Sequence, residues 1–168
     1  MPDPVNHSAA AAKADSASTE KRLPILLRHA WYGLNQAFRR RIAHTGVTPD
    51  QFTVMRNLAE GEPLGLTQSR LTELMGSDPN TMTALIDRME THGWVERHPH
   101  EHDRRARRIR LKPTGRRTYG QLRAIALDLQ QEILRSLPED RRDSFLDDLR
   151  AVATTCRTLA EESHKGDD

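Results

Sequence analysis

Residues 78–112 constrain the fold most, because they join a short amphipathic helix to an arginine-rich hairpin. Four apolar residues recur at helical spacing and predict one buried face: Met82, Leu85, Ile86 and Met89. Asp78 suits the N-cap and Pro79 suits the first helical position, so the start of the helix is sharply defined. The side opposite the apolar stripe is small or polar at its N-terminal end, and such a face fits a DNA groove.

A hairpin with one basic face follows this helix. Residues 94–97 and 108–112 are the predicted strands, with Glu96 and Arg97 near the solvent end of the first. In the second strand Ile109 and Leu111 point inward and alternate with outward basic residues, which predicts a two-stranded ribbon.

The positive charge of the chain is concentrated in this hairpin. Residues 97–117 contain nine Lys or Arg and two acidic residues, a net charge of +7, whereas the whole chain carries only +2. Such a narrow basic ribbon beside a groove-sized helix favours a polyanionic partner, and the phosphate backbone is the commonest one.

The composition indicates one domain with helical arms. The 168 residues are 36% hydrophobic and 30% charged, with a mean hydropathy of −0.75, which suits helices that bury their apolar stripes against a partner. No apolar run is long enough to cross a bilayer, and the N-terminus lacks a secretory signal. These features predict a cytoplasmic, nucleoid-associated protein without a membrane partner.

Helical periodicity and breakers divide the chain into four expected parts. Residues 1–20 are expected as a disordered tail, 21–45 as an N-terminal dimerisation helix, 46–113 as a winged helix-turn-helix, and 114–164 as C-terminal dimerisation helices. The predicted fold class is mainly α with a small β-hairpin wing, a minor α+β variant with helical dimerisation arms.

Capping signals place the helices within these parts. Thr48 opens a capping box for one helix, and Thr67 caps the next, from residue 68 to residue 75. The inward residues of that helix are expected to be Leu71, Leu74 and Met75. A tight turn at Gly76 then leads into the helix after Asp78, which completes a helix-turn-helix.

The C-terminal part carries a heptad pattern. A long helix capped by Thr114 is expected to end near Pro138, and a last helix begins in the acidic stretch that follows. Its apolar residues recur with heptad spacing at Phe145, Leu149, Val152, Cys156 and Leu159. Together with Leu27 of the first helix, the first four of these residues are the predicted dimer interface.

Two sequence runs resemble the MarR family of bacterial transcriptional regulators. One is D-x-R-x-x-x-I-x-L-x-x-x-G over residues 103–115, and the other is L-I-D-R-M-E at 85–90 followed by G-W-V-E-R at 93–97. The resemblance covers roughly residues 23–162. It departs from the family pattern at Lys112, where a Thr is usual, so that the cap after the hairpin would rest on Thr114.

The resemblance implies a homodimer on double-stranded DNA. The first helix and the last two helices would form the dimer interface, the helices after Asp78 would enter successive major grooves, and the wings would lie over minor grooves. By the same resemblance, Asp103 orients Arg105, and Arg105 is the minor-groove finger.

The candidate DNA contacts fall into three groups. The recognition helix offers Asn80, Thr81, Thr83 and Arg88, the preceding helix offers Thr67, Gln68 and Ser69, and the wing offers Asp103, Arg104, Arg105, Arg107 and Arg108. Asn pairs with adenine edges and the Thr methyl group contacts thymine, so base contacts are expected from the recognition helix.

The resemblance also implies a site for small phenolic effectors, which the sequence places near Arg28, Trp31 and Tyr32 on the first helix. A small aromatic acid or phenol is therefore the expected effector, and the protein is expected to be a repressor that this effector releases. The alternatives are a constitutive DNA-binding dimer, and a metal-responsive regulator that uses His98, His100 and His102.

Solvated or phosphate-facing histidines are favoured over a metal site, because alternating histidines on one face of a hairpin do not converge into a closed shell. Cys156 is expected to be a small buried apolar group rather than a redox sensor. No phosphate-binding loop, nucleophile elbow or zinc-protease motif is present, so neither an enzyme nor a cofactor is predicted. A helical adaptor that binds only proteins would leave the charge of the wing unexplained.

Overall fold

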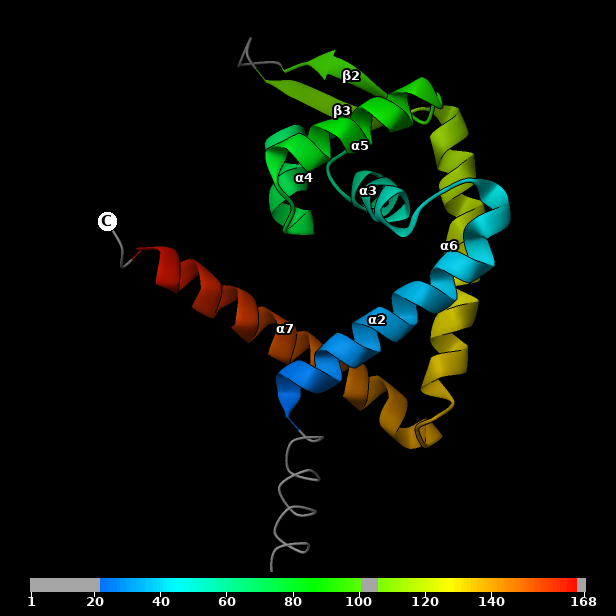
Figure 1. Ribbon diagram of the computed structural model, residues 1–168, viewed down its shortest axis with the longest axis vertical. Helices are drawn as coiled ribbons and strands as arrows, with labels where there is room; N and C mark the ends of the chain where they lie inside the picture. The colour runs from blue at the N-terminus through cyan, green and yellow to red at the C-terminus, as the bar shows by residue number, and fades with distance from the viewer. Residues whose placement is uncertain (1–21, 101–105, 166–168) are drawn as a thin grey trace, which may run out of the picture. The chain divides into compact units, whose positions relative to one another are not determined.

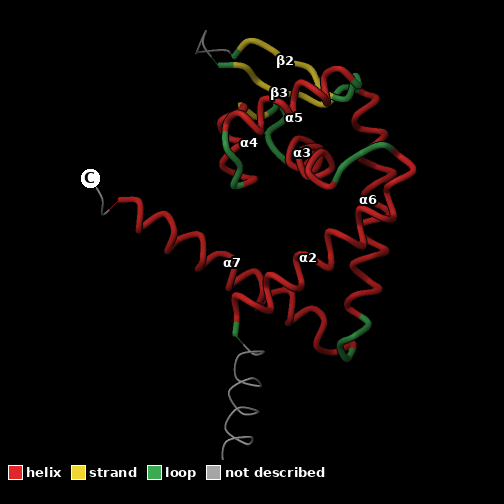
Figure 2. Tube along the Cα trace, viewed as in Figure 1, coloured by secondary structure: helices red, strands yellow, loops and turns green. Residues whose placement is uncertain are grey.

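The computed structural model describes residues 22–100 and 106–165, with side chains as far as residue 162. It divides into two compact units, residues 1–126 and residues 127–168. The tail expected at residues 1–20 lies outside the described residues, as does the tip of the wing at residues 101–105. For the described residues, Figures 1 and 2 show helices in both units and strands only in one small sheet of the first.

The first two described helices of the first unit are α2 and α3. Helix α2 (Leu23–Ile42) ends through a short 3-10 segment, η1 (Ala43–Thr45), and Gly46 closes it with a φ of 71°. Helix α3 (Pro49–Glu60) starts at the predicted capping box, where Gln51 N donates to Thr48 Oγ1 at 3.2 Å and Thr48 N donates to Gln51 Oε1 at 2.9 Å.

The helix-turn-helix consists of α4 (Gln68–Met75) and α5 (Pro79–Thr91), as predicted. Gly76 makes the turn between them with a φ of 55°, a conformation that favours glycine. Leu71 of α4 is fully buried, but Leu74 is 42% exposed, so the prediction that Leu74 faces inward is wrong. It lies on the side of the helix that borders a surface cavity instead.

The sheet has three antiparallel strands in the order β1-β3-β2 rather than the two that were predicted. Strand β2 (Val95–Pro99) pairs with β3 (Arg107–Leu111), and the added strand is β1 (Leu66–Thr67). The extra strand forms because the chain before it turns at Gly65, where φ is 86°, and lies against Ile109 so closely that a Cβ would overlap the Ile109 carbonyl oxygen.

Helix α6 (Pro113–Leu134) begins two residues earlier than the predicted N-cap at Thr114 indicates. Thr114 is not the N-cap, because its hydroxyl donates to the carbonyl oxygen of Gly93, while Arg116 N donates to the carbonyl oxygen of Lys112. Gly115 is buried here, and a Cβ on it would overlap the Trp94 carbonyl oxygen. The start of α6 is therefore tied to the turn that ends the recognition helix.

The core of the first unit joins these elements. Phe52 of α3 packs between Phe38 of α2, at a ring distance of 4.8 Å, and Tyr119 of α6, at 5.7 Å. The four apolar residues predicted for the buried face of α5 are all buried, with exposures of 5% or less: Met82, Leu85, Ile86 and Met89. This face anchors α5 and leaves its other side at the surface.

The second unit contains the last part of α6, the 3-10 segment η2 (Glu139–Arg141) and helix α7 (Arg142–Lys165). The predicted break at Pro138 is confirmed, and Arg142 Nε bridges it by donating to the carbonyl oxygens of Leu134 and Leu137, at 3.1 and 3.2 Å. Across both units, the described helices include none that is both long and apolar enough to span a membrane.

Candidate nucleic-acid interface

The N-terminal end of α5 presents the polar residues that were predicted to contact bases. Asp78 Oδ1 accepts hydrogen bonds from Asn80 N at 3.0 Å and Thr81 N at 2.9 Å, so the first turn is fixed. These bonds, above all those from Thr81, lower the pKa of Asp78 and keep it ionised. The side chains of Asn80 and Thr81 are exposed beside this cap.

The two helices of the motif are joined by a polar contact at this end. Gln68 Nε2 of α4 donates to Thr83 Oγ1 of α5 at 2.6 Å, and that hydroxyl donates to the carbonyl oxygen of Pro79 at 2.8 Å. The structure therefore brings Gln68 and Thr83 together and orients both. Thr67 Oγ1 accepts from Arg70 N at 3.2 Å as the N-cap of α4, and Ser69 is exposed next to it.

Arg88 lies on the exposed side of the last turn of α5. Its carbonyl oxygen is 2.7 Å from His92 Nδ1, and the His92 ring stacks on Trp94 at a centroid distance of 4.6 Å. This contact closes the helix before the wing begins. The guanidinium of Arg88 is thus placed at the surface near the helix end, away from the cap formed by Asp78.

Arg97 was predicted to lie near the solvent end of the first strand, and this prediction is wrong. Its guanidinium donates to Asp87 Oδ1 at 2.6 Å and to Glu90 Oε2, and its side chain is only 25% exposed. Partial burial would lower the pKa of Arg97, but the two carboxylates outweigh it and raise the pKa. The alternation of side chains along the strand was the missed signal, because it places Arg97 on the same face as buried Val95, two residues earlier.

The two outer-face arginines of β3 are held by the loop before β1. Arg108 Nη1 donates to the carbonyl oxygen of Gly65 at 2.8 Å and to Glu62 Oε2 at 3.2 Å, and Arg110 Nε donates to the carbonyl oxygen of Leu64 at 2.7 Å. The Arg108 side chain is only 14% exposed. A phosphate contact by Arg108 stays a prediction, but it would need the guanidinium to serve the loop and the DNA together.

The remaining wing residues are at or beyond the described tip. Arg107 is exposed at the distal end of β3. Asp103, Arg104 and Arg105 lie outside the described residues, so their roles stay predictions.

The histidines of the wing contact carboxylate and backbone groups. His98 Nε2 lies 2.8 Å from Glu96 Oε1, and this contact with His98 lowers the pKa of Glu96. His100 N donates to the carbonyl oxygen of Ala106 at 3.3 Å. Among the residues that the structure describes, no three His, Cys, Asp or Glu side chains are grouped as a metal site would need. His102 lies outside these residues.

Comparison with known proteins decides the family. Residues 45–106 match the family model described as "MarR family". The HTH-type transcriptional regulator YsmB of Bacillus subtilis, itself uncharacterised, is 35% identical over 127 residues, which are 75% of this chain and 80% of that protein. The chain belongs to the MarR family. It is a DNA-binding, winged helix-turn-helix transcriptional regulator.

Solved structures of MarR-family proteins share this fold. The repressor CouR bound to a 23-mer DNA duplex superposes with a TM-score of 0.72 at 25% identity, covering 80% of this chain and 94% of that one. CouR from Rhodococcus jostii RHA1 bound to p-coumaroyl-CoA gives a TM-score of 0.70 at 23% identity, covering 80% and 93%. This MarR-family chain thus resembles one protein that has been seen with DNA and with an aromatic ligand.

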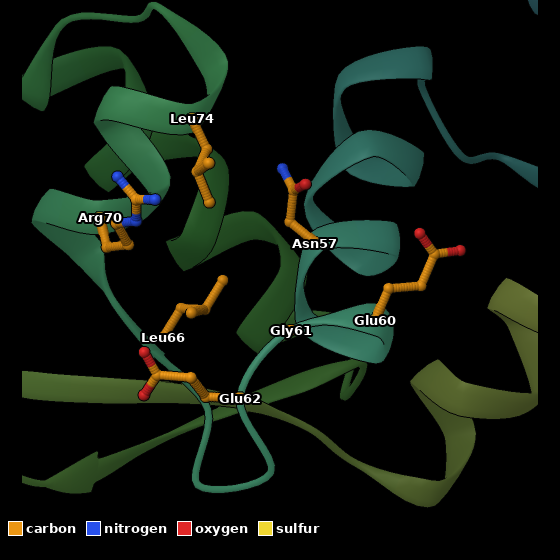
Figure 3. A pocket seen from close by; sticks show the side chains of 7 residues that line it. All are labelled: Asn57, Glu60, Gly61, Glu62, Leu66, Arg70 and Leu74. Atoms are coloured by element: carbon orange, nitrogen blue, oxygen red, sulfur yellow. The ribbon is translucent and has the colours of Figure 1, made fainter. Parts of the chain in front are cut away.

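A surface cavity of about 280 Å³ lies between α3 and α4 of the first unit, with Asn57 and Leu74 on opposite sides (Figure 3). Its carboxylates already have partners: Tyr119 donates to Glu60, and Arg108 donates to Glu62. This cavity is not the effector site that was predicted around Trp31. Arg28, Trp31 and Tyr32 lie exposed on α2, with Trp31 at 66%, and they do not line this cavity.

Proposed function

We propose that this MarR-family regulator binds an inverted repeat in double-stranded DNA as a homodimer and represses transcription. The observation that carries the proposal is the N-terminal end of α5. There Asn80 and Thr81 are exposed beside a fixed cap, and Thr83 is held by Gln68 of the neighbouring helix. Pre-positioned Asn and Thr side chains at the start of a recognition helix suit base contacts in the major groove.

The proposed dimer uses residues 21–45 and 114–164. The described side chains of α7 include none that is buried, and its heptad residues Phe145, Leu149 and Leu159 are 42%, 38% and 57% exposed. Cys156 is also exposed in the single chain, whereas the sequence analysis expects it in a buried seam. A second copy would cover these residues together with Leu27 of α2, which is half-buried.

The proposed effector is a small aromatic acid or phenol. CouR, which has the same fold, has been seen with p-coumaroyl-CoA, an aromatic acyl thioester. The exposed Trp31 and Tyr32 of α2 would supply aromatic surface, and Arg28 would supply a cation for a carboxylate. The ligand would weaken DNA binding only by as much as it prefers the non-binding arrangement of the dimer, roughly 5- to 150-fold.

Selection from a random duplex library tests the DNA proposal. The wild-type protein should enrich an inverted repeat whose half-sites are about one helical turn apart, ~10 bp. A spacer longer by half a turn should abolish tight binding, because it puts the second half-site on the opposite face of the duplex. Equal affinity for both spacings would contradict the dimeric docking.

The wing is tested on the selected duplex. Arg105→Ala should weaken binding by about 1 to 3 kcal/mol, because a minor-groove arginine contributes both charge and shape readout. Asp103→Asn should cause part of the same loss. Wild-type affinity in both variants would show that the wing tip does not contribute.

A further inference from the structure

Arg97 occupies a special place on the inner face of the wing. In the β2–β3 register it is paired with Ile109, and the neighbouring inward pair is Val95 with Leu111. Ile109 is fully buried, and Val95 and Leu111 are 1% and 6% exposed. Arg97 therefore sits where the apolar underside of the hairpin ends, directly against the recognition helix.

Two carboxylates of α5 share the guanidinium of Arg97. Asp87 and Glu90 are three residues apart, so their side chains lie on one face of the helix, and both bond to Arg97 through different nitrogens. Asp87 Oδ1 accepts a hydrogen bond from Nη2 at 2.6 Å, and Glu90 Oε2 accepts one from Nη1. A planar guanidinium can bridge two acceptors in this way, whereas a Lys ammonium lacks the fixed fork.

The charge of this cluster argues against a phosphate contact. One arginine with two carboxylates carries a formal net charge of −1, although Arg97 belongs to the basic run that the sequence suggests for DNA. Two of the five N–H donors of Arg97 already bond to these carboxylates. A phosphate would have to reach the other donors of a side chain that is three-quarters covered, against the negative charge of the two carboxylates beside it.

We infer that Arg97 is a positioning residue, which fixes the wing against the recognition helix through Asp87 and Glu90 and does not itself bind DNA. This inference rests on the proposed function. The outer face of the same ribbon is held by Arg108 and Arg110 to the loop before β1. Hydrogen bonds thus hold the hairpin on both faces, and those of Arg97 on the inner face connect it to the recognition helix α5.

Salt-dependent DNA binding separates a positioning residue from a phosphate contact. Each phosphate neutralised by the protein contributes roughly 0.9 to the slope of log K against log salt concentration. Arg97→Ala should therefore weaken binding to the selected duplex by on the order of 10-fold with an unchanged slope. Arg107→Ala is the matched control: Arg107 is an exposed arginine of the same hairpin, and its loss should reduce the slope by about one.

The conservative variant Arg97→Lys gives a second, independent readout. Lys keeps the charge but not the fork, so it should bind DNA nearly as poorly as Arg97→Ala if Arg97 positions the wing. A phosphate contact would instead be largely restored by Lys. Hydroxyl-radical footprints should lose protection under the wing in both variants and keep it in the major groove.

Three outcomes would overturn the inference. These are a slope reduced by about one in Arg97→Ala, wild-type affinity in that variant, or rescue by Lys. Circular dichroism of each variant without DNA checks the fold. If Arg97→Ala is unfolded, the DNA affinity of Arg97→Lys decides whether Arg97 positions the wing. Wild-type protein that binds the selected duplex no tighter than a scrambled one would overturn the proposed function itself, whereas a wild-type-like Arg97→Ala overturns only the role of Arg97.

Discussion

The winged-helix part of the chain and its last helix differ sharply in how they bury apolar side chains. Residues 49–111 contain most of the core, including the fully buried Met55, Leu71 and Ile86. Helix α7 is as amphipathic in sequence, yet none of its described side chains is buried, and Phe145 is 42% exposed. The same kind of apolar stripe is thus buried in the first region and exposed at the described residues of the second.

This difference indicates where each region gets its stability. Burial of apolar area stabilises by roughly 25 cal/mol per Å², so the winged-helix part supplies its own driving force. Helix α7 gains little from burial as a single copy, because isolated helices depend on the packing of their apolar face. The two regions should therefore respond differently to substitution, and four predictions test the comparison.

The largest effect is expected for Phe145→Asp. A charge in the proposed seam would weaken the homodimer by about 4 kcal/mol, because a symmetric interface carries each substitution twice at roughly 2 kcal/mol. Sedimentation velocity over a concentration series should show monomers where the wild type is dimeric. Far-ultraviolet circular dichroism should still report a folded winged-helix part.

Thr154→Asp is the matched control for this substitution. Thr154 lies nine residues after Phe145 on the same helix, a separation of about half a turn in projection, so it points to the opposite side of α7. It should leave the dimer unchanged. If both variants dimerise like the wild type, the heptad seam is not the interface.

Much of the winged-helix part was predictable because its signals are local. The caps at Thr48, Thr67 and Asp78 and the four buried residues of α5 follow from spacing and side-chain chemistry within single helices, and the structure confirms them. The family resemblance is also confirmed.

The features that the sequence analysis missed depend on contacts between distant segments. Strand β1 forms because Leu66 meets Ile109, more than forty residues later. The partners of Arg108 in the loop before β1, and the donation from Thr114 to Gly93, are equally non-local. The inward direction of Arg97 could have been predicted from the alternation of side chains along the strand. Its carboxylate partners could not, because they depend on how the ribbon packs on α5.

A smaller effect is expected for Gly115→Ala at the start of α6. A methyl group there would overlap the Trp94 carbonyl oxygen and crowd the Leu111 side chain, so the substitution should destabilise by about 1 to 3 kcal/mol. Gly120→Ala on the same helix is the control, because nothing lies within 4 Å of its Cβ position. There the higher helix propensity of Ala should stabilise by up to about 1 kcal/mol.

Urea unfolding of both glycine variants measures this contrast. Opposite shifts of the midpoint would support a self-contained winged-helix part whose packing tolerates no extra methyl group at Gly115. Equal shifts would mean that α6 starts in a looser environment than the structure describes. The Phe145→Asp background should leave the contrast intact.

Tyr119→Phe should cost about 1 kcal/mol, because Tyr119 donates a hydrogen bond to Glu60 from a largely buried position. Burial, and then the Glu60 carboxylate, raise the pKa of Tyr119 above its ordinary value of 10.0. The stability that this phenol contributes is therefore full below pH 10.0 and falls as the pH rises through the higher folded pKa. Alkaline unfolding should be less steep in Tyr119→Phe, and identical alkaline profiles would contradict the Glu60 contact.

The smallest effect concerns Asp78 at the start of the recognition helix. Hydrogen bonds from the side chain and backbone of Thr81 lower the pKa of Asp78 below 3.8, so its capping contribution is full above that pH and is lost as the pH falls through the lower folded pKa. A nuclear magnetic resonance titration of the Asn80 and Thr81 amides should report this value. Thr81→Val should move it back towards 3.8, and Asp78→Asn, a comparable cap without a charge, should abolish the titration. Because the cap belongs to the region that supplies its own packing, the titration should be the same in the Phe145→Asp background. A value that changed there would mean that the start of the recognition helix depends on the dimer after all.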